Sequence, residues 1–173
     1  MPGYEIEQKY RLKDPAAMRR MLAALGARPI DKARESDTFF DRASEELRRE
    51  RCVLRLRRAG TSAYLTFKGP RLRSQFKKRV EIEMPVDFEK TRQLLAALGY
   101  RVFASVSKTR EKYKLRGTLI TLDFVSGAGW FAEIEGRAGD ILEISRRLGL
   151  HQREERSYLE LAGRYKPKAG GLL

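Results

Sequence analysis

The stretch YEIEQKYRL, residues 4–12, alternates between uncharged and charged residues, a pattern typical of a half-buried β-strand. Because successive side chains of a strand point to opposite faces, Glu5, Glu7 and Lys9 share one face. The other face carries Ile6 and further, largely apolar residues. The sequence therefore places two carboxylates and an ammonium side by side, in a chain whose formal net charge is +14.

The Glu-Ile-Glu triplet occurs twice more, at 81–83 and 133–135, and its surroundings indicate an internal repeat. The segment EIEQKYRLKDPAAMRRMLAALGAR, from Glu5, resembles EIEMPVDFEKTRQLLAALGYR, from Glu81, in its strand, its aspartate-capped helix and its terminal LAALG. Amphipathic helices with this ending also resemble one another by chance, and the match is too short for a solenoid. We interpret it as a two-fold pseudo-repeat of a strand–helix–strands unit.

Capping residues and glycines mark the ends of the predicted helices. Four helices are predicted: from Asp14 to Gly26, from Asp87 to Gly99, from about Asp140 to Gly149, and a short one around 157–162. Strands are predicted at 3–12, 36–41, 52–59, 62–68, 77–85, 101–115, 117–126 and 129–136. The short turns between consecutive strands imply antiparallel pairing, so the expected fold class is α+β.

Composition limits the classes of protein to which the chain can belong. Its 173 residues suffice for a single domain, which we expect to span 1–165, followed by a flexible tail at 166–173. The single cysteine excludes an internal disulfide and a thiolate metal site, and the single histidine argues against histidine catalysis. No apolar run is long enough to span a bilayer and no cleavable leader is recognisable, so a cytoplasmic location is expected.

One face of nearly every predicted strand is charged. The same alternation, applied along the chain, assigns these cations to the charged faces: Lys9, Arg55, Arg57, Lys68, Arg79, Lys108 and Arg110. It assigns an equal number of carboxylates: Glu5, Glu7, Glu81, Glu83, Asp123, Glu133 and Glu135. An ordinary sheet with one solvated face is the alternative, but it would carry a more varied set of polar residues. If the sheet closes with the helices outside, the charged face lines the interior.

An interior with balanced charges suits a ligand with many negative charges that binds together with divalent metal ions. Arginine and lysine bind phosphate oxygens, and carboxylates bind Mg²⁺ or Mn²⁺, which bridge phosphates. The excess positive charge alone would also suit a nucleic acid or a membrane surface. A nucleic-acid binder, however, would seldom place so many carboxylates among its phosphate-binding groups. The pattern favours an interior polyphosphate–metal site and argues against nucleic-acid and membrane partners.

An ordered series of motifs resembles the CYTH superfamily, also called the triphosphate tunnel metalloenzymes. The first strand fits the Glu-x-Glu-x-Lys signature of that family. The matching segments that follow are SDTFFD at 36–41, LRLR at 54–57, LTFKGP at 65–70, RVEIE at 79–83, VSKTREKY at 106–113 and LDFVSGAGWFAEIE at 122–135. The last of these, with Ser157-Tyr158, is most similar to the CyaB-like branch, the class IV adenylyl cyclases. Arg42 departs from the pattern, because the family often has threonine there.

The resemblance implies an eight-stranded antiparallel closed barrel, a tunnel that binds a triphosphate and Mg²⁺ or Mn²⁺. It implies substrate binding by the inward cations, with these as catalytic candidates: Lys9, Arg55, Lys68 and Arg110. The leading metal ligands would be Glu5, Glu7, Glu133 and Glu135, with Asp123, Glu81 and Glu83 completing the set or orienting waters. For any single member, a structural salt bridge inside the barrel is the alternative. Lys112 and Lys114 are predicted to be surface charges.

Two activities share such a site. In a cyclase the 3′-hydroxyl of ATP attacks the α-phosphorus and releases pyrophosphate. In a triphosphatase, water attacks a terminal phosphorus of tripolyphosphate, thiamine triphosphate or a nucleoside triphosphate. The resemblance to one branch favours the cyclase. A non-catalytic polyphosphate- or RNA-binding protein is an alternative from another class, and exposed strand edges or the basic surface would support a homodimer.

Overall fold

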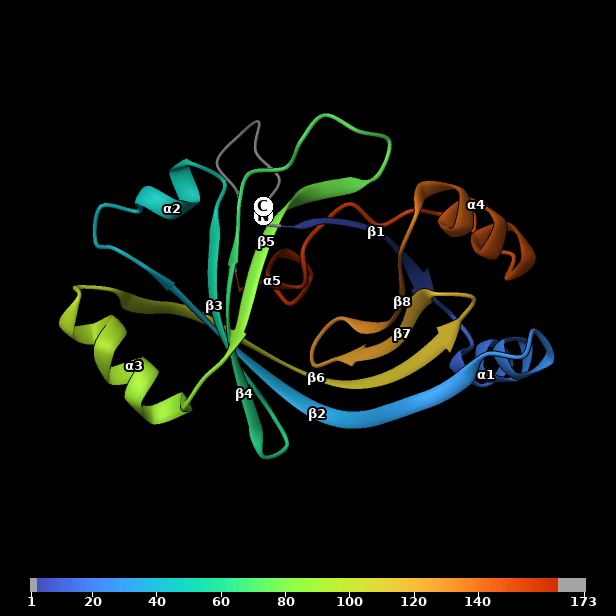
Figure 1. Ribbon diagram of the computed structural model, residues 1–173, viewed down its shortest axis with the longest axis horizontal. Helices are drawn as coiled ribbons and strands as arrows, with labels where there is room; N and C mark the ends of the chain where they lie inside the picture. The colour runs from blue at the N-terminus through green and yellow to red at the C-terminus, as the bar shows by residue number, and fades with distance from the viewer. Residues whose placement is uncertain (1–2, 165–173) are drawn as a thin grey trace.

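The computed structural model describes residues 3–164, which form a closed barrel of antiparallel strands with most of the helices outside it (Figure 1). The strands are β1 (Gly3–Leu12), β2 (Arg28–Asp41), β3 (Val53–Ala59), β4 (Ser62–Lys68), β5 (Lys77–Pro85), β6 (Arg101–Leu115), β7 (Thr118–Val125) and β8 (Gly129–Glu135). The helices are α1 (Pro15–Ala24), α2 (Glu46–Arg49), α3 (Phe88–Ala97), α4 (Ala138–Arg147) and α5 (Tyr158–Leu161). The predicted α+β class and eight-stranded barrel are confirmed, while the predicted tail at 166–173 lies outside the described residues.

The strand order around the barrel is β1-β5-β4-β3-β2-β6-β7-β8, and β8 pairs back to β1. Exchanging β1–β4 with β5–β8, one for one, gives the same ring read in the opposite direction. The chain is therefore built from two strand–helix–strands halves related by a pseudo-two-fold axis, with α1 after β1 and α3 after β5. This confirms the repeat predicted from the first two Glu-Ile-Glu segments. The third copy lies in β8, which corresponds to β4 in the other half rather than to β1.

The two halves begin alike because an aspartate precedes the helix in each. The Asp14 carboxylate accepts a hydrogen bond from the amide of Ala17 at 2.9 Å, and Asp87 accepts one from Lys90 at 2.8 Å. Each bond satisfies an amide that the first turn of a helix leaves without a partner. A glycine at positive φ follows each helix and turns the chain into the next strand.

Helices cover much of the apolar outer face of the barrel. Leu22 of α1 and Ile141 of α4 are fully buried in one cluster with Ile134 of β8, on the side where both helices lie in Figure 1. On the other side, Leu95 of α3 packs with Leu56 of β3. Burial of each such side chain contributes about 1.5–3 kcal/mol, so the apolar face is held outward and the charged face inward. No helix within residues 3–164 has the length and apolar character to cross a membrane.

The short helix α5 packs against the inside of the barrel rather than its outer surface. Leu159 is buried with Phe39, Val125 and Phe131, which occupy inward-facing positions of β2, β7 and β8. The segment 157–159 also lines the cavity of the barrel. This region, called the α5 end below, joins an apolar cluster to the charged interior of the barrel.

The main differences from the sequence prediction concern β2, α2 and α4. β2 begins at Arg28 rather than at 36, because its first half pairs with β6, a distant segment that local pattern does not reveal. The helix α2 is absent from the prediction, because amides in its first turn donate to the carboxylate of Asp41, which lies well before the helix. α4 begins at Ala138, so Asp140 lies in its first turn and does not cap it.

Candidate active site

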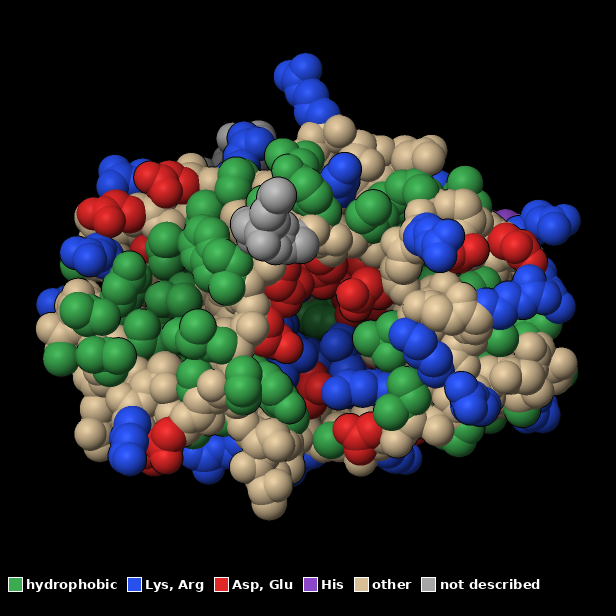
Figure 2. Space-filling model, viewed as in Figure 1, with side chains coloured by type: hydrophobic (Ala, Val, Ile, Leu, Met, Phe, Trp, Pro, Cys, Tyr) green, Lys and Arg blue, Asp and Glu red, His purple; other side chains and the backbone are tan. Residues whose placement is uncertain are grey.

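The barrel encloses a cavity of about 480 Å³, and small-molecule sites span about 300–1,000 Å³. Figure 2 shows a hollow near the centre of one face, in which acidic and basic side chains gather. All the predicted substrate-binding cations line the cavity: Lys9, Arg55, Arg57, Lys68, Arg79, Lys108 and Arg110. So do these predicted metal ligands: Glu5, Glu7, Glu81, Glu83, Glu133 and Glu135. The inward position of these residues is thereby established, while the role of each stays a prediction.

Asp123, the remaining predicted ligand, is fully buried and paired with other residues. Arg110 binds it through two nitrogens, at 2.7 and 2.5 Å, and also lies 2.5 Å from Glu133. The Tyr158 hydroxyl donates to Asp123 at 2.7 Å. Burial opposes the charge on Arg110, but Asp123 and Glu133 raise its pKa well above the ordinary value. Asp123 therefore fixes the positions of Arg110 and Tyr158.

A second buried network, absent from the prediction, joins β2, β3 and β6. Asp37 accepts hydrogen bonds from Arg57 at 2.6 and 2.9 Å and from Lys108 at 3.1 Å. Glu35 lies 3.1 Å from both of these cations. Burial alone would raise the pKa of Asp37, but Lys108 and Arg57 hold it well below its ordinary value. Glu35 escaped prediction because the predicted strand begins at 36.

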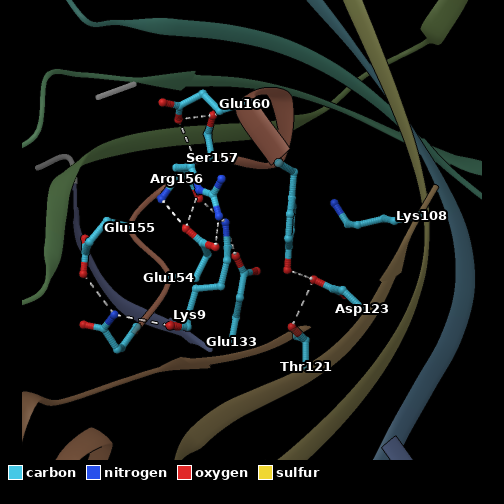
Figure 3. A network of polar contacts seen from close by, with 12 residues as sticks. Lys9, Lys108, Thr121, Asp123, Glu133, Glu154, Glu155, Arg156, Ser157 and Glu160 are labelled. Atoms are coloured by element: carbon cyan, nitrogen blue, oxygen red, sulfur yellow. Dashed lines mark hydrogen bonds and ion pairs between the residues drawn. The ribbon is translucent and has the colours of Figure 1, made fainter. Parts of the chain in front are cut away.

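Lys9 lies at the α5 end of the cavity. Its ammonium lies 3.4 Å from Glu133, donates to the carbonyl of Arg156 at 3.1 Å, and stands 3.8 Å from the centre of the Tyr158 ring. Figure 3 shows Lys9 beside Glu133 and the segment that leads into α5. Burial, reinforced by the nearby Asp123, raises the pKa of Tyr158 well above its ordinary value, so Tyr158 remains a neutral donor.

Lys68 binds two of the predicted metal ligands at once. Its ammonium lies 2.8 Å from an oxygen of Glu5 and 2.8 Å from an oxygen of Glu81. Burial raises the pKa of Glu5, Lys68 opposes that rise, and the neighbouring Glu81 adds to it. Nearby, Arg55 donates to Glu83 at 3.3 Å.

Four charged side chains of the cavity form no ion pair with residues 3–164: Glu7, Glu135, Lys77 and Arg79. Their strands, β8, β1 and β5, are neighbours, and Lys77 is opposite Glu7, which is opposite Glu135. Partial burial raises the pKa of Glu135, and repulsion from neighbouring glutamates adds to the rise. Burial, with nearby cations, lowers the pKa of Lys77 to about 7. These four residues, called the unpaired wall, carry charges available to a ligand.

Two further cavity cations, Lys77 and Arg71, are missing from the prediction. Alternation could have revealed Lys77, because it lies two residues before Arg79 on the same face of β5. Arg71 lies in a loop, where alternation carries no information. Lys112, predicted to be a surface charge, lines the cavity and lies 3.9 Å from a carboxylate of β2. Lys114 is exposed, as predicted.

The profile of the CYTH domain matches residues 3–158, which include all the strands of the barrel. The chain belongs to the CYTH domain family. A putative adenylate cyclase of Methanocaldococcus jannaschii is 31% identical to this CYTH protein, over 92% of this chain and 98% of that one. Adenylate cyclase CyaB of Aeromonas hydrophila is 32% identical, over 91% of this chain and 88% of that one.

The barrel of this CYTH protein also matches solved structures. A putative adenylyl cyclase from Hippeastrum, described as having a dominant triphosphatase activity, superposes with a TM-score of 0.73. The match covers 94% of this chain and 98% of that one at 17% identity, a level that supports a shared fold alone.

Divalent metal ions are expected in a CYTH protein, and the donor chemistry of the cavity fits them. Mg²⁺ and Mn²⁺ take oxygen ligands, and a cation would relieve the repulsion between glutamates that, after burial, raises the pKa of Glu135. As the side chains stand, no three acidic, cysteine or histidine residues of the described chain are placed to hold one ion. Lys68 lies between Glu5 and Glu81, so a metal bound there requires its ammonium to move.

Proposed function

We propose that this CYTH protein is a divalent-metal-dependent enzyme that acts on a triphosphate inside the barrel, and that it converts ATP to cyclic AMP and pyrophosphate. The observation that carries the proposal is the cavity lined by cations from β1 and β3–β6, with carboxylates among them. A ligand with several anionic groups fits a cavity with so many cations. The adenylate cyclase names of two relatives favour cyclisation of ATP.

Binding of the phosphate chain is assigned to the inward cations: Lys9, Arg55, Arg57, Lys68, Arg79, Lys108 and Arg110. Pairs such as Arg57 with Asp37 hold the cations in place before the substrate arrives, so little reorganisation is needed when it binds. Neutralisation of the leaving pyrophosphate is assigned to Lys9, Arg55, Lys68 and Arg110.

Metal binding is assigned to Glu5, Glu7, Glu133 and Glu135, with Glu81 and Glu83 beside them. Asp123, which Arg110 and Tyr158 bind, would hold Arg110 in position against Glu133. A bound Mg²⁺ or Mn²⁺ ion supplies Lewis-acid polarisation of a phosphoryl oxygen.

In the proposed reaction, the 3′-oxygen of ATP forms a bond to the α-phosphorus. The bond from that phosphorus to the oxygen bridging the α- and β-phosphates breaks, the hydroxyl proton passes to water, and pyrophosphate leaves with the electrons of the broken bond. The residues of the chain supply position and positive charge, which stabilise the charge that develops on the bridging oxygen.

Triphosphate hydrolysis is the second candidate, because a protein of the same fold from Hippeastrum is described as having a dominant triphosphatase activity. It differs in the nucleophile, since water would attack a terminal phosphorus. Incubation with ATP, thiamine triphosphate or tripolyphosphate, and with Mg²⁺ or Mn²⁺, followed by separation of cyclic AMP, pyrophosphate and orthophosphate, distinguishes the two. Absence of turnover with all three substrates would contradict both.

Substitution of a candidate ligand separates an enzyme from a non-catalytic binding protein. Glu133→Gln removes a charge from the cavity, whereas Glu143→Gln removes one from an exposed pair with Arg116 on the outer surface. An enzyme should lose metal-dependent turnover in the first variant and keep it in the second. A binding protein would show no turnover in the unsubstituted chain and would still bind tripolyphosphate after either change.

A further inference from the structure

Lys77 is a cavity cation whose charge the rest of the protein does not balance by contact. It is 4% exposed, and its ammonium nitrogen has no hydrogen-bond partner among residues 3–164. Other lysines of the cavity differ, because Lys9, Lys68 and Lys108 lie 2.8–3.4 Å from carboxylate oxygens. A buried charge without a partner is unfavourable. An anionic ligand that enters the cavity would supply that partner.

The charges around Lys77 define the chemistry of such a ligand. Glu7 is its neighbour on β1 but forms no ion pair with it. After burial, Lys9 and then Arg71 are the cations that lower its pKa. Arg71 has a free donor of its own: its Nε atom is buried without a partner, while its other nitrogens donate to the carbonyl of Glu155 at 3.1 Å. Unsatisfied donors on adjacent cations suit an anion with several oxygens.

The segment that leads into α5 fixes where this anion would lie. Lys9 donates to the carbonyl of Arg156, and Arg71 donates to the carbonyl of Glu155. Both cations are therefore anchored by the chain at the α5 end, and Lys77, Lys9 and Arg71 all line the same cavity.

We propose that Lys77, with Arg71 beside it, binds a phosphate group of the substrate at the α5 end of the cavity. The inference rests on the proposed function, because it takes the ligand to be a triphosphate. Lys77 is a substrate-binding residue in this view, and it adds a phosphate contact that the inward cations predicted from the sequence do not include. The phosphate oxygens supply the partners that the ammonium lacks.

Lys78 provides a matched control for this inference. It is the next residue of β5, so its side chain lies on the opposite face, where its ammonium stands 4.7 Å from the centre of the Tyr4 ring. Lys77→Met and Lys78→Met therefore remove the same charge from the inside and the outside of one strand.

The dissociation constant for tripolyphosphate in the presence of Mg²⁺, measured by calorimetry, tests the proposal. Lys77→Met should weaken binding by about 10- to 100-fold, whereas Lys78→Met should leave it unchanged. The Tm of ligand-free Lys77→Met should be equal to or above that of the unsubstituted chain, because an unpaired buried charge is removed. Lys77→Arg, which keeps the charge, should recover most of the affinity.

Equal affinity in Lys77→Met and the unsubstituted chain would overturn the inference and leave the proposed function standing. A lower Tm with unchanged affinity would assign Lys77 a structural role and overturn it as well. If the unsubstituted chain fails to bind or turn over any triphosphate, the proposed function itself is wrong. If Lys77→Met does not fold, Lys77→Gln gives the same comparison with a smaller change of polarity.

Discussion

Lys68 joins Glu5 to Glu81, with its ammonium 2.8 Å from an oxygen of each carboxylate. The three side chains come from β4, β1 and β5, which are consecutive strands of the barrel. One ammonium thus lies between two carboxylates in the kind of position that a divalent cation also favours. A metal ion bound to this pair of acidic groups would therefore compete with the lysine.

Replacement of Lys68 with methionine should affect metal and triphosphate in opposite directions. Without the competing ammonium, Mn²⁺ alone should bind Glu5 and Glu81 more tightly, by about tenfold or more. Tripolyphosphate at saturating Mn²⁺ should bind more weakly by a similar factor, because a phosphate-binding cation is lost. Electron paramagnetic resonance of Mn²⁺ measures the first effect and calorimetry the second. Exposed Lys90 on α3 supplies the control, and parallel loss of both affinities would contradict the competition.

Replacement of Arg110 with methionine should lower the free energy of unfolding. Asp123, fully buried, would lose its bidentate partner, and leaving one member of a buried pair uncompensated costs about 3–5 kcal/mol. Arg116→Met removes an exposed arginine that lies 3.0 Å from Glu143, a change expected to cost about 0–1 kcal/mol. Urea unfolding measures both free energies.

The double substitution Arg110→Met with Asp123→Leu separates the lost pair from lost packing. It removes both charges, so it should recover a large part of the stability lost in the single variant. A double variant less stable than Arg110→Met alone would show that Asp123 stabilises the fold through its other partner, Tyr158.

Alternation along strands predicted most of the interior, because a strand has two faces and the apolar one must be covered. It was sufficient for Glu5 and Arg79, which lie inward as predicted. It failed for Glu35, because the exposed first half of β2 has no apolar face and is held by pairing with the distant β6. The inward position of a residue in a regular strand is a local property, and the extent of a strand is not.

Which charges pair with which could not be predicted from one sequence. Alternation places Asp123 and Glu133 on the same charged face. Asp123 nevertheless forms its ion pair with Arg110, because Asp123 and Arg110 are directly opposite in the β6–β7 register. Register between strands depends on the closed barrel as a whole. For the same reason, the lack of a partner at Lys77 becomes visible only in three dimensions.

Replacement of Tyr158 with phenylalanine should reduce stability while sparing substrate affinity. The hydroxyl that donates to buried Asp123 at 2.7 Å would be lost, at a cost of about 1–3 kcal/mol. The ring that lies 3.8 Å from the Lys9 ammonium would remain. Thermal unfolding should show a lower Tm, and calorimetry an unchanged dissociation constant for tripolyphosphate. Tyr158→Ala, which also removes the ring, should lower both the Tm and the affinity for tripolyphosphate. A loss of affinity in Tyr158→Phe would assign the hydroxyl to substrate binding.

The ionised carboxylate of Glu111 should make part of the folding stability depend on pH. Its carboxylate accepts hydrogen bonds from Arg19 at 2.8 Å and from Tyr113 at 3.0 Å, and lies 3.1 Å from Lys32, so it connects β6 to α1 and β2. The bond from Arg19 is the main cause that lowers its pKa from 4.5 to about 2. A carboxylate with a lowered folded pKa adds stability above its unfolded pKa, and this stability is lost as the pH falls from about 4.5 through about 2.

Glu111→Gln isolates this contribution, because glutamine does not titrate. At pH 7 the variant should be less stable by about 1–2 kcal/mol, the loss expected for partly exposed charge-assisted hydrogen bonds. The difference between the two proteins should shrink as the pH falls below 4.5, since only the glutamate loses its charge. Urea unfolding at pH 7, 4.5 and 3 measures it, with Glu143→Gln as a surface control that should change little at any pH. A difference that stays constant from pH 7 to pH 3 would mean that the carboxylate charge of Glu111 contributes nothing to holding α1 and β2 against β6.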